Sequence, residues 1–445
     1  MVREVPGIAR RETRDGDRRP PTMRLLLVAL GSSGDVHPFV GIGLALQERG
    51  HRVTVLTNGR FEPLMRRAGL DFHAVGFAED YERATQDPDL WDPLKGLGVV
   101  WRRVCEPAMK LTYDFIGKEA ASERCVVVAS PFAFGARLAQ ETMGVPLVTA
   151  YLQPAMLRTC HGEIEIAGVK IPAWLPVPVR NWLWRAVDWL VVDRLFCPGL
   201  NGLRRKLGLG PVGNVLGRWI HSPCRGIALF PDWFAPAQPD WPRQLAITGF
   251  PLFDEAPLRG KPPGLEEFLA EGDRPVVFTP GSAMRHARRF FQASLEACRT
   301  LSRRAIFLTQ YADQVPADLP PTVRNFDYVP FSLLLDRAAA LVHHGGIGTC
   351  AQAMKAGVPQ LVVPMAHDQF DNASRVEALG LGCSVRARDM KSVLPEKLSR
   401  LLDAQGVKAR CREVAGKFRA VNPLSDICDL IEASARSSAL GMEGT

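Results

Sequence analysis

Residues 24–57 read RLLLVALGSSGDVHPFVGIGLALQERGHRVTVLT. An apolar run is followed by a glycine-rich turn, a helical periodicity that ends at Gly50, and a second apolar run. Two apolar runs joined by a helix are typical of a βαβ unit, in which both strands are parallel and buried. This stretch therefore predicts the first crossover of an α/β domain.

The same alternation continues along the chain, with an irregular, tryptophan-rich middle. The further apolar runs lie at residues 71–76, 124–130, 145–151, 274–282, 303–310, 323–330, 338–349 and 358–364. We therefore expect two Rossmann-like, doubly wound domains that face each other across a cleft. In such domains ligands bind beyond the carboxyl ends of the strands, so the site should lie between the domains.

Proline-rich stretches at residues 231–244 and 251–263 indicate where the first domain ends. We assign the chain to four parts: a disordered leader, an N-terminal Rossmann-like domain, a C-terminal Rossmann-like domain, and a C-terminal helix and tail. Their predicted bounds are 1–22, 23–245, 246–425 and 426–445.

The composition is that of an ordinary globular protein. Of the 445 residues, 47% are apolar and 23% charged, which excludes a disordered, collagen-like or coiled-coil chain. The net charge of +8 favours acidic ligands or an anionic membrane face, and we do not expect nucleic acid as a partner. The ten scattered cysteines form no CxxC pair and no short-spaced cluster with histidine, so we expect no zinc site. Since no signal peptide precedes them, we expect reduced thiols in a cytosolic protein. With no long uncharged apolar stretch, a cytoplasmic location is expected, and peripheral contact with the inner face of the membrane stays open.

A second glycine turn carries the candidate ligand chemistry. In residues 338–364 a strand ends at His343–His344, and a helix begins near Gly348–Thr349. A helix N-terminus offers unpaired N–H groups and a partial positive charge, which suits a diphosphate. The alternative is an ordinary strand–turn–helix with a satisfied histidine. Asp368 and Gln369 follow the next strand, where a carboxylate and an amide can bind two sugar hydroxyls.

The whole segment 338–372 resembles the donor-binding motif of the family one nucleotide-sugar glycosyltransferases, enzymes with the GT-B fold. The resemblance implies a C-terminal domain that binds the donor and an N-terminal domain that binds the acceptor. The residues that it assigns to the donor are Ser282, Tyr328, Val329, His344, Gly346, Gly348, Thr349, Gln352, Asp368 and Gln369.

Within that set, the resemblance implies separate roles. His344 and Thr349 would hold the diphosphate, Gly346 would permit its close approach, and Asp368 and Gln369 would bind the sugar.

Two shorter strings complete the implied donor site. TPGS (279–282) resembles a phosphate-facing loop and makes Ser282 a hydrogen-bond donor. DYVP (327–330) resembles the base contact, with Tyr328 standing where plant members carry a stacking tryptophan.

Gln352 departs from the family pattern, because many members have there a glutamate that accepts hydrogen bonds from both ribose hydroxyls. A thymidine nucleotide has one ribose hydroxyl, so the amide favours a dTDP donor over a UDP donor, although an amide can also serve UDP.

The turn GSSGDVHP (31–38) resembles that of bacterial family members acting on sterols, macrolide-type antibiotics and lipids. In those enzymes its aspartate takes the place of the plant enzymes' catalytic histidine, which implies that Asp35 is the general base. Two alternatives remain. Asp35 could simply cap the helix that starts near Pro38, and His37 could be the base instead of a support for Asp35.

The implied reaction is inverting transfer, since one base and one set of positive groups suffice, whereas glycoside hydrolysis needs two opposed carboxylates. We expect no metal and no cofactor beyond the nucleotide-sugar co-substrate, a dTDP- or UDP-hexose. The DxD-like triplet Asp87–Pro88–Asp89 is interpreted as a solvated loop.

The tryptophan-rich segment 153–230 should shape the acceptor side of the cleft. Trp174, Trp182 and Trp184, with arginines between them, suggest a surface that covers an aliphatic ligand or rests on lipid headgroups. The alternative is a helical hairpin that buries its aromatic side chains in the core.

Strings such as GSSGDVHPF, PDWFAPAQPDWP and PMAHDQFDNASRV look most like the rhamnosyltransferases of bacterial rhamnolipid synthesis. That resemblance implies dTDP-L-rhamnose as donor and a hydroxyacyl lipid as acceptor. The alternatives are a UDP-glucose-dependent glucosyltransferase acting on a sterol, polyketide or other small hydrophobic acceptor, a nucleotide-sugar epimerase or hydrolase, and a non-catalytic nucleotide-sugar-binding chain.

Overall fold

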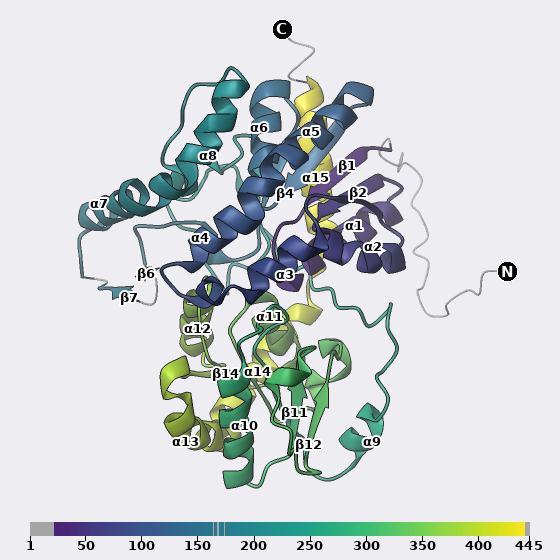
Figure 1. Ribbon diagram of the computed structural model, residues 1–445, viewed down its shortest axis with the longest axis vertical. Coiled ribbons are helices and arrows are strands. Elements are labelled where there is room, and N and C mark those ends of the chain that lie inside the picture. The colour runs from purple at the N-terminus through teal and green to yellow at the C-terminus, as the bar shows by residue number, and fades with distance from the viewer. Residues whose placement is uncertain (1–21, 163, 167–168, 173, 441–445) are drawn as a thin grey trace, which may run out of the picture.

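The computed structural model describes residues 22–162, 164–166, 169–172 and 174–440. Two parallel β-sheets, each flanked by helices, form an upper and a lower lobe (Figure 1). The predicted α/β fold with two doubly wound domains is thus confirmed. We call the lobes the N-terminal and the C-terminal domain.

The N-terminal domain is built on a seven-stranded sheet of order β3-β2-β1-β4-β5-β8-β9. Its strands are β1 Arg24–Val28, β2 Arg52–Thr57, β3 Asp71–Ala74, β4 Cys125–Ala129, β5 Leu147–Tyr151, β8 Arg225–Ala228 and β9 Leu245–Ile247. Its helices are α1 Ser33–Glu48, α2 Glu62–Ala68, α3 Ala78–Gln86, α4 Gly96–Val100, α5 Glu106–Ser122, α6 Phe134–Met143, α7 Val177–Val187 and α8 Asp193–Lys206. A separate hairpin pairs β6 Ile164–Ile166 with β7 Val169–Ile171.

The C-terminal domain is built on a six-stranded sheet of order β12-β11-β10-β13-β14-β15. Its strands are β10 Val276–Thr279, β11 Ala305–Leu308, β12 Val323–Phe326, β13 Ala340–His343, β14 Gln360–Val362 and β15 Gly382–Ser384. The remaining helices are α9 Leu265–Ala270, α10 Arg288–Thr300, α11 Ile347–Ala356, α12 Gln369–Ala378, α13 Met390–Asp403, α14 Gln405–Arg419 and α15 Pro423–Leu440.

The central strands are buried because their sequences are mostly apolar. β4 reads CVVVA and β5 reads LVTAY, and every residue of both is buried. Parallel pairing places Leu26 of β1 beside Thr54 of β2 and Val127 of β4. The order of strands reverses between β1 and β4 in one sheet and between β10 and β13 in the other, and such switch points are where α/β domains bind ligands.

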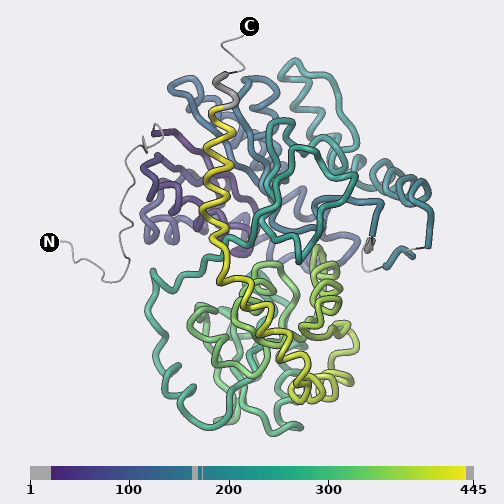
Figure 2. The backbone as a smooth tube through the Cα atoms, turned by 180° about the vertical axis from the view of Figure 1, so that it is seen from behind, coloured from purple at the N-terminus to yellow at the C-terminus, as the bar shows by residue number. Residues whose placement is uncertain are grey.

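Helix α15 returns from the C-terminal domain and packs against α1 of the N-terminal domain, as the view from behind shows (Figure 2). Arg49 donates to Asp429 and Glu432, and the ring of His51 contacts Glu432 at 3.1 Å. The two domains are therefore joined twice, by the linker after β9 and by α15.

The element bounds refine the predicted division of the chain. The boundary placed after residue 245 falls inside β9, and the boundary placed after residue 425 falls inside α15. The predicted leader lies, except for Thr22, outside the described residues, as do the last five residues of the predicted tail.

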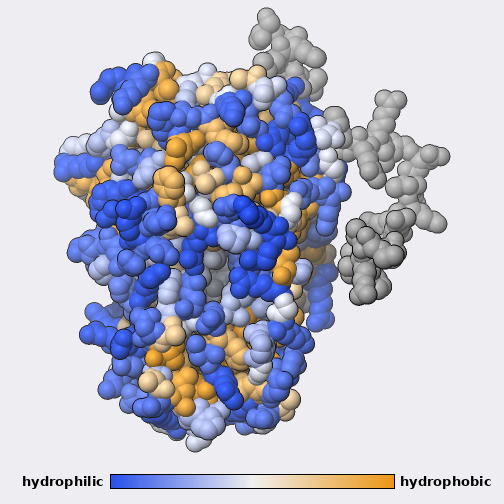
Figure 3. Space-filling model, turned by 45° about the vertical axis from the view of Figure 1, so that its right-hand side comes forward, coloured by the Kyte–Doolittle hydropathy of each residue, from blue (hydrophilic) through white to orange (hydrophobic). Residues whose placement is uncertain are grey.

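The surface changes character between the domains. On the face in Figure 3, a mostly hydrophilic band crosses the middle of the molecule and separates apolar patches above and below it. No helix of the described residues is both long and apolar enough to cross a membrane.

Candidate functional site

The turn between β13 and α11 forms an open helix N-terminus. Gly345 has a φ of 94°, a conformation that favours glycine, and Gly346 is the N-cap residue of α11. The first N–H groups of α11 therefore have no partner within the helix. A Cβ at Gly348 would meet no atom within 4 Å, so the space beside this first turn is open. Thr349 belongs to the same turn.

The two neighbouring histidines differ in their hydrogen bonding. His343 is fully buried and satisfied, since Gly345 N–H donates to its Nδ1 at 3.1 Å and its Nε2 meets Gln360 Oε1 at 3.1 Å. His344 Nδ1 is buried and meets no hydrogen-bond partner among the described residues. Burial lowers the pKa of His344 to about 4, so its ring is neutral at physiological pH. The alternative considered from the sequence, a core histidine with its hydrogen bonds satisfied within the protein, thus applies to His343.

Two glycines hold the ring of His344 in place. A Cβ at Gly281 would lie 2.8 Å from Nε2 of His344, and one at Gly346 would lie 2.5 Å from the same atom. The ring is therefore held between the loop after β10 and the N-terminus of α11. Ser282, the next residue of that loop, is exposed.

The loop after β14 is fixed by side chains of α12. Asn372 donates to Asp368 Oδ2 at 2.7 Å and to the carbonyl oxygen of Gly345 at 2.9 Å. Gln369 Oε1 accepts the N–H groups of Met365 and Ala366 at 2.8 and 3.2 Å. The carboxamide oxygen of Gln369 is committed to the loop, so its N–H groups are what it can offer a sugar hydroxyl.

Asp35 lies in the first turn of α1, directly after the turn that follows β1. Its Oδ2 accepts Ser32 N–H at 2.7 Å and the Ser32 hydroxyl at 3.1 Å. Gly31 has a φ of 135°, and a Cβ there would lie 2.2 Å from Oδ2. The helix begins at Ser33 and not near Pro38, and its N-cap residue is Ser32. Asp35 is therefore not the N-cap residue itself but the third residue of the helix, which completes a capping box with Ser32. Burial raises the pKa of Asp35 in spite of these hydrogen bonds.

His37 faces away from that turn, toward the linker. Its Nε2 lies 3.6 Å from Glu255 Oε1, and its ring packs edge-on against Phe253. Burial alone would raise the pKa of Glu255, but hydrogen bonds from His37 and Arg67 lower it to about 2.

The Asp35 turn and the donor motif oppose each other across the two domains. Helices α1 and α11 are in contact, and residues of both share one apolar cluster. Burial, reinforced by the negative charge of Asp35, raises the pKa of Asp368 to about 7. The structure therefore brings together the predicted base and the predicted sugar-binding carboxylate.

Three further residues predicted to contact the donor differ in their surroundings. Tyr328 OH accepts the backbone N–H of Glu255 at 3.3 Å, and the guanidinium of Arg259 lies over its ring at 5.0 Å. The side chain of Val329 is buried in the core, so contact with a base would have to come from its backbone. Gln352 is buried on α11.

The predicted acceptor tryptophans do not gather at this centre. Trp174 and Trp182 are 79% and 65% exposed, whereas Trp184 turns inward and donates to the carbonyl oxygen of Thr159 at 3.0 Å. None of them lines the cavity of about 690 Å³ that lies between Arg158 and His221 in the N-terminal domain.

Several residues of the site were missed in the sequence. Arg285 follows Ser282 in the loop after β10, its guanidinium lies over the ring of Tyr311 at 4.6 Å, and its buried Nε has no partner among the described residues. Asn372 was also missed, as was Glu255. The only sequence signal for Arg285 was its short distance along the chain from Ser282, and the only one for Asn372 was its short distance from Asp368. No sequence signal indicated Glu255.

A contact between the domains involves the loop that carries Asp368. His367 has a φ of 58°, and its ring lies edge-on to Trp91 with 6.0 Å between centroids. A Cβ at Gly96 would lie 3.0 Å from that ring. The sequence could not reveal this, because the segment around Trp91 is remote along the chain.

The DxD-like triplet belongs to the same segment. Asp87 accepts Asp89 N–H at 3.1 Å, and Asp89 pairs with Lys95 on the surface. Nowhere in the described part of the chain do three or more His, Cys, Asp or Glu side chains gather in a way that would hold a metal ion.

Two family models match the chain. The N-terminal domain of glycosyltransferase family 28 matches residues 25–161, and the C-terminal domain of erythromycin biosynthesis protein CIII-like proteins matches residues 304–429. The first match includes the Asp35 turn and the second the His344 turn.

Curated relatives match most of the chain. O-mycaminosyltylonolide 6-deoxyallosyltransferase of Streptomyces fradiae is 30% identical over 94% of this chain and 99% of its own length. Glycosyltransferase GtfC of Amycolatopsis orientalis is 30% identical over 89% of this chain and 94% of its own. Sterol 3-beta-glucosyltransferase UGT80A2 of Arabidopsis thaliana is 28% identical over 82% of this chain and 58% of its own length.

Solved structures share the fold. The glycosyltransferase of kitacinnamycin superposes with a TM-score of 0.70 at 21% identity, covering 94% of this chain and all of its own. Spinosyn rhamnosyltransferase SpnG, complexed with thymidine diphosphate, superposes with a TM-score of 0.64 at 19% identity, covering 92% of this chain and all of its own.

Proposed function

Because this chain belongs to the family one nucleotide-sugar glycosyltransferases of the GT-B fold, we propose that it transfers L-rhamnose from dTDP-rhamnose to a hydroxyl of a lipid-type acceptor. The transfer inverts the anomeric carbon and uses no metal and no cofactor. One observation carries the proposal: helix α1 of the N-terminal domain, with Asp35 in its first turn, contacts helix α11 of the C-terminal domain, which begins at the predicted donor-binding turn.

Asp35 acts as the general base. The acceptor oxygen attacks the anomeric carbon from the face opposite the nucleotide and gives its proton to Asp35 as the new bond forms. Both hydrogen bonds that Ser32 gives to Asp35 end on Oδ2, which fixes the carboxylate and leaves Oδ1 for the acceptor. The raised pKa of Asp35 makes it a stronger base than an exposed aspartate. His37, whose ring faces Glu255, is a support in this scheme.

The bond between the anomeric carbon and the diphosphate oxygen breaks in the same step, so negative charge grows on the leaving group. The N-terminal N–H groups of α11, together with Ser282, His344 and Thr349, stabilise that charge. His344 suits this role because its Nδ1 has no protein partner and its ring is already fixed. Arg285 adds the positive charge that the neutral His344 does not supply.

The sugar and nucleotide are proposed from two observations. A 30% identical relative is by its name a 6-deoxyallosyltransferase, and rhamnose is likewise a 6-deoxyhexose. Gln352, buried on α11, suits the single ribose hydroxyl of a thymidine nucleotide. The second candidate is UDP-glucose-dependent transfer to a sterol or polyketide, which the sterol glucosyltransferase relatives favour.

The acceptor is proposed to be hydrophobic because curated relatives of this chain are by name sterol glucosyltransferases. A hydroxyacyl lipid fits that description. Such an acceptor partitions into bilayers, so peripheral contact with the inner face of the membrane is part of the proposal.

Incubation with labelled dTDP-rhamnose or UDP-glucose, with and without a hydroxyacyl lipid, tests the proposal. We expect rhamnosylated lipid only when both dTDP-rhamnose and lipid are present. Sugar release without acceptor would indicate a hydrolase, and an isomerised donor an epimerase. Glucosyl product from UDP-glucose would instead support the second candidate.

A further inference from the structure

Helix α7 turns its polar side toward the protein and its apolar side outward. It continues through a π-helical turn, Asp188–Val192, directly into α8, and it projects from the side of the upper lobe (Figure 1). A surface helix normally turns its apolar side toward the core.

The inner side of α7 is held by polar contacts. Arg180 Nη1 and Trp184 Nε1 donate to backbone carbonyls of the loop 159–162 at 2.8 and 3.0 Å. Asp188 is buried and pairs with Arg158. These contacts settle which side of the helix faces the protein.

The opposite side carries tryptophan and arginine. Trp182 and Trp189 are 65% and 68% exposed and lie seven residues apart, which places them on one side of a helix with Arg185 between them. Arg194 lies over the ring of Trp189 at 5.6 Å, in the five-residue register that a π-helical turn creates. We call this surface the tryptophan face.

Apolar exposure is concentrated here. Among the described residues, eight of the thirteen exposed large hydrophobic side chains lie between residues 169 and 191. A patch of this kind on an otherwise well-packed domain indicates an interaction surface.

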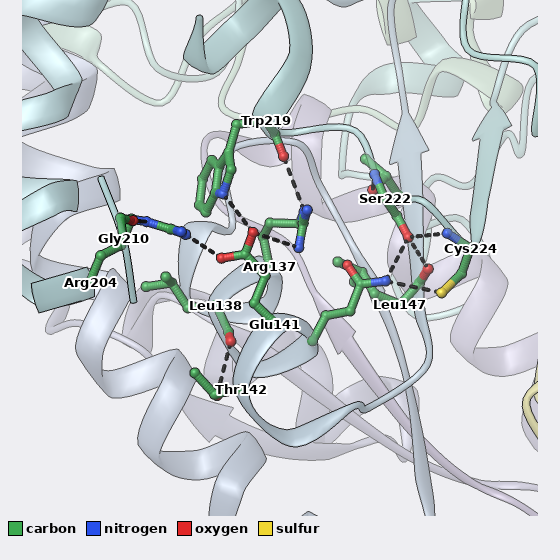
Figure 4. A network of polar contacts seen from close by, with 12 residues as sticks. Arg137, Leu138, Glu141, Thr142, Leu147, Arg204, Gly210, Trp219, Ser222 and Cys224 are labelled. Atoms are coloured by element: carbon green, nitrogen blue, oxygen red, sulfur yellow. Dashed lines mark hydrogen bonds and ion pairs between the residues drawn. The ribbon is translucent and has the colours of Figure 1, made fainter. Parts of the chain in front are cut away.

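Polar contacts also anchor the far end of α8, the helix into which α7 continues (Figure 4). Arg204 of α8 pairs with Glu141 of α6, Trp219 Nε1 donates to Glu141 Oε1 at 3.0 Å, and Arg137 Nε donates to the carbonyl oxygen of Trp219 at 3.1 Å. The continuous helix α7–α8, which carries the tryptophan face, is thus anchored to the rest of the N-terminal domain.

Within the segment that carries the tryptophan face, residues 174–194, the charges left at the surface have one sign. Between residues 174 and 194 the only carboxylates are Asp188, which is buried and paired, and Asp193, which accepts the backbone N–H groups of Asn214 and Val215. The charged groups left at the surface there are the exposed guanidinium groups of Arg185 and Arg194.

We propose that the tryptophan face docks the protein on a membrane of anionic phospholipid. Indole rings favour the boundary between headgroups and acyl chains, and neighbouring arginines are attracted to lipid phosphates. Uniformly positive charge matches an anionic lipid surface, whereas docking to a protein partner or to a second copy of the chain does not require it. The reason for such docking rests on the proposed function, in which the acceptor is a lipid. The test of the docking itself needs neither donor nor acceptor.

Sedimentation of the full chain with vesicles tests the inference. We expect binding to phosphatidylcholine vesicles that contain phosphatidylglycerol, and much weaker binding to pure phosphatidylcholine. The double variant Trp182→Ala, Trp189→Ala should lower the partition coefficient about tenfold or more. The double variant Arg185→Glu, Arg194→Glu should remove the preference for the anionic vesicles.

Phe77→Ala is the matched control, since Phe77 is 73% exposed but lies on another segment. It should leave vesicle binding unchanged, and circular dichroism with thermal melting should show that all variants are folded. Equal binding to both vesicle types, no binding to either, or an equal loss in Phe77→Ala would overturn the inference. A dimer that dissociates in the Trp182→Ala, Trp189→Ala variant would identify the face as an interface between copies instead.

Discussion

Asp35 owes its position to two neighbours in the chain. Ser32 donates twice to its Oδ2, and Gly31 leaves the space in which that oxygen lies. A cap and a base are therefore compatible roles for one carboxylate, because the cap uses one oxygen and proton transfer can use the other.

Asp35→Asn should test the base directly. The amide oxygen can still accept from Ser32, so the helix cap is kept, but the side chain no longer takes a proton. We expect kcat to fall about 10²–10⁴-fold while the affinity for thymidine diphosphate changes little. Steady-state kinetics and calorimetric titration measure the two quantities, and near-normal turnover would remove Asp35 from the mechanism.

In the ligand-free protein, Asp368 should lower the free energy of unfolding at neutral and alkaline pH. Its folded-state pKa of about 7 is above the ordinary value of 3.8, so the folded protein resists ionisation of this carboxyl. The cost is absent below about pH 4, grows as the pH rises toward 7, and is complete above it. Asp368→Asn should therefore stabilise the protein by roughly 2–4 kcal/mol at pH 8 and not at pH 4, as measured by urea unfolding.

The same variant should weaken donor turnover, since Asp368 is proposed to bind the sugar. The exposed carboxylate Asp336 supplies the control, and Asp336→Asn should change stability little at either pH. A stability gain of Asp368→Asn that is equal at both pH values would contradict the assigned ionisation.

At the scale of elements, each half of the site is a strand, a tight turn and the N-terminus of a helix. The turn after β1 places a carboxylate, and the turn after β13 places N–H groups and a histidine. In both, a glycine with positive φ lets the backbone turn sharply enough for the helix to begin at the edge of the sheet.

Gly31→Ala should displace Asp35 without removing it. A methyl group there would lie 2.2 Å from Oδ2, so the carboxylate must move, and we expect kcat to fall at least about tenfold. Gly50→Ala is the control, since Gly50 also has a positive φ, of 91°, but a Cβ there would meet no atom within 4 Å.

Both substitutions should lower stability by about 1–2 kcal/mol through backbone strain, as thermal unfolding would measure. Only Gly31→Ala should impair turnover. An equal loss of activity in both variants would show that strain, and not the position of Asp35, is responsible.

At the scale of the whole molecule, the linker residue Glu255 ties the two domains together. Its carboxylate accepts from Arg67 of α2 and from Arg259 of the linker at 2.7 Å each, and it faces His37 of α1. Its backbone N–H donates to Tyr328 of the C-terminal domain. One residue thus connects the helix that carries Asp35 with the expected base-binding residue.

Glu255→Gln should loosen this connection, because a neutral amide replaces a carboxylate paired with two arginines. We expect kcat to fall about tenfold. The affinity for thymidine diphosphate should change little, since the residues proposed to bind the diphosphate all belong to the C-terminal domain. Small-angle scattering should show a larger radius of gyration. Glu266→Gln, which removes a surface pair with Lys261 and Arg337, should change neither quantity.

Most of the fold could be predicted from local pattern. The apolar runs identify β1 to β5 and β10 to β14, because a parallel strand buried on both faces must be apolar at nearly every position. The inner strand β8 and the edge strands β9 and β15 are short, and a short run carries too little pattern to be distinguished from a loop.

The sequence by itself determined the α/β class, the two turns and the residue types that they carry, because strand periodicity, glycine turns and helix starts are local properties of a chain. Only the tertiary structure decided which histidine has an unsatisfied nitrogen, that His37 faces Glu255, and that Trp184 points inward while Trp182 points outward. Those facts depend on contacts between segments far apart in sequence, and burial and electrostatic fields arise only when such segments pack together.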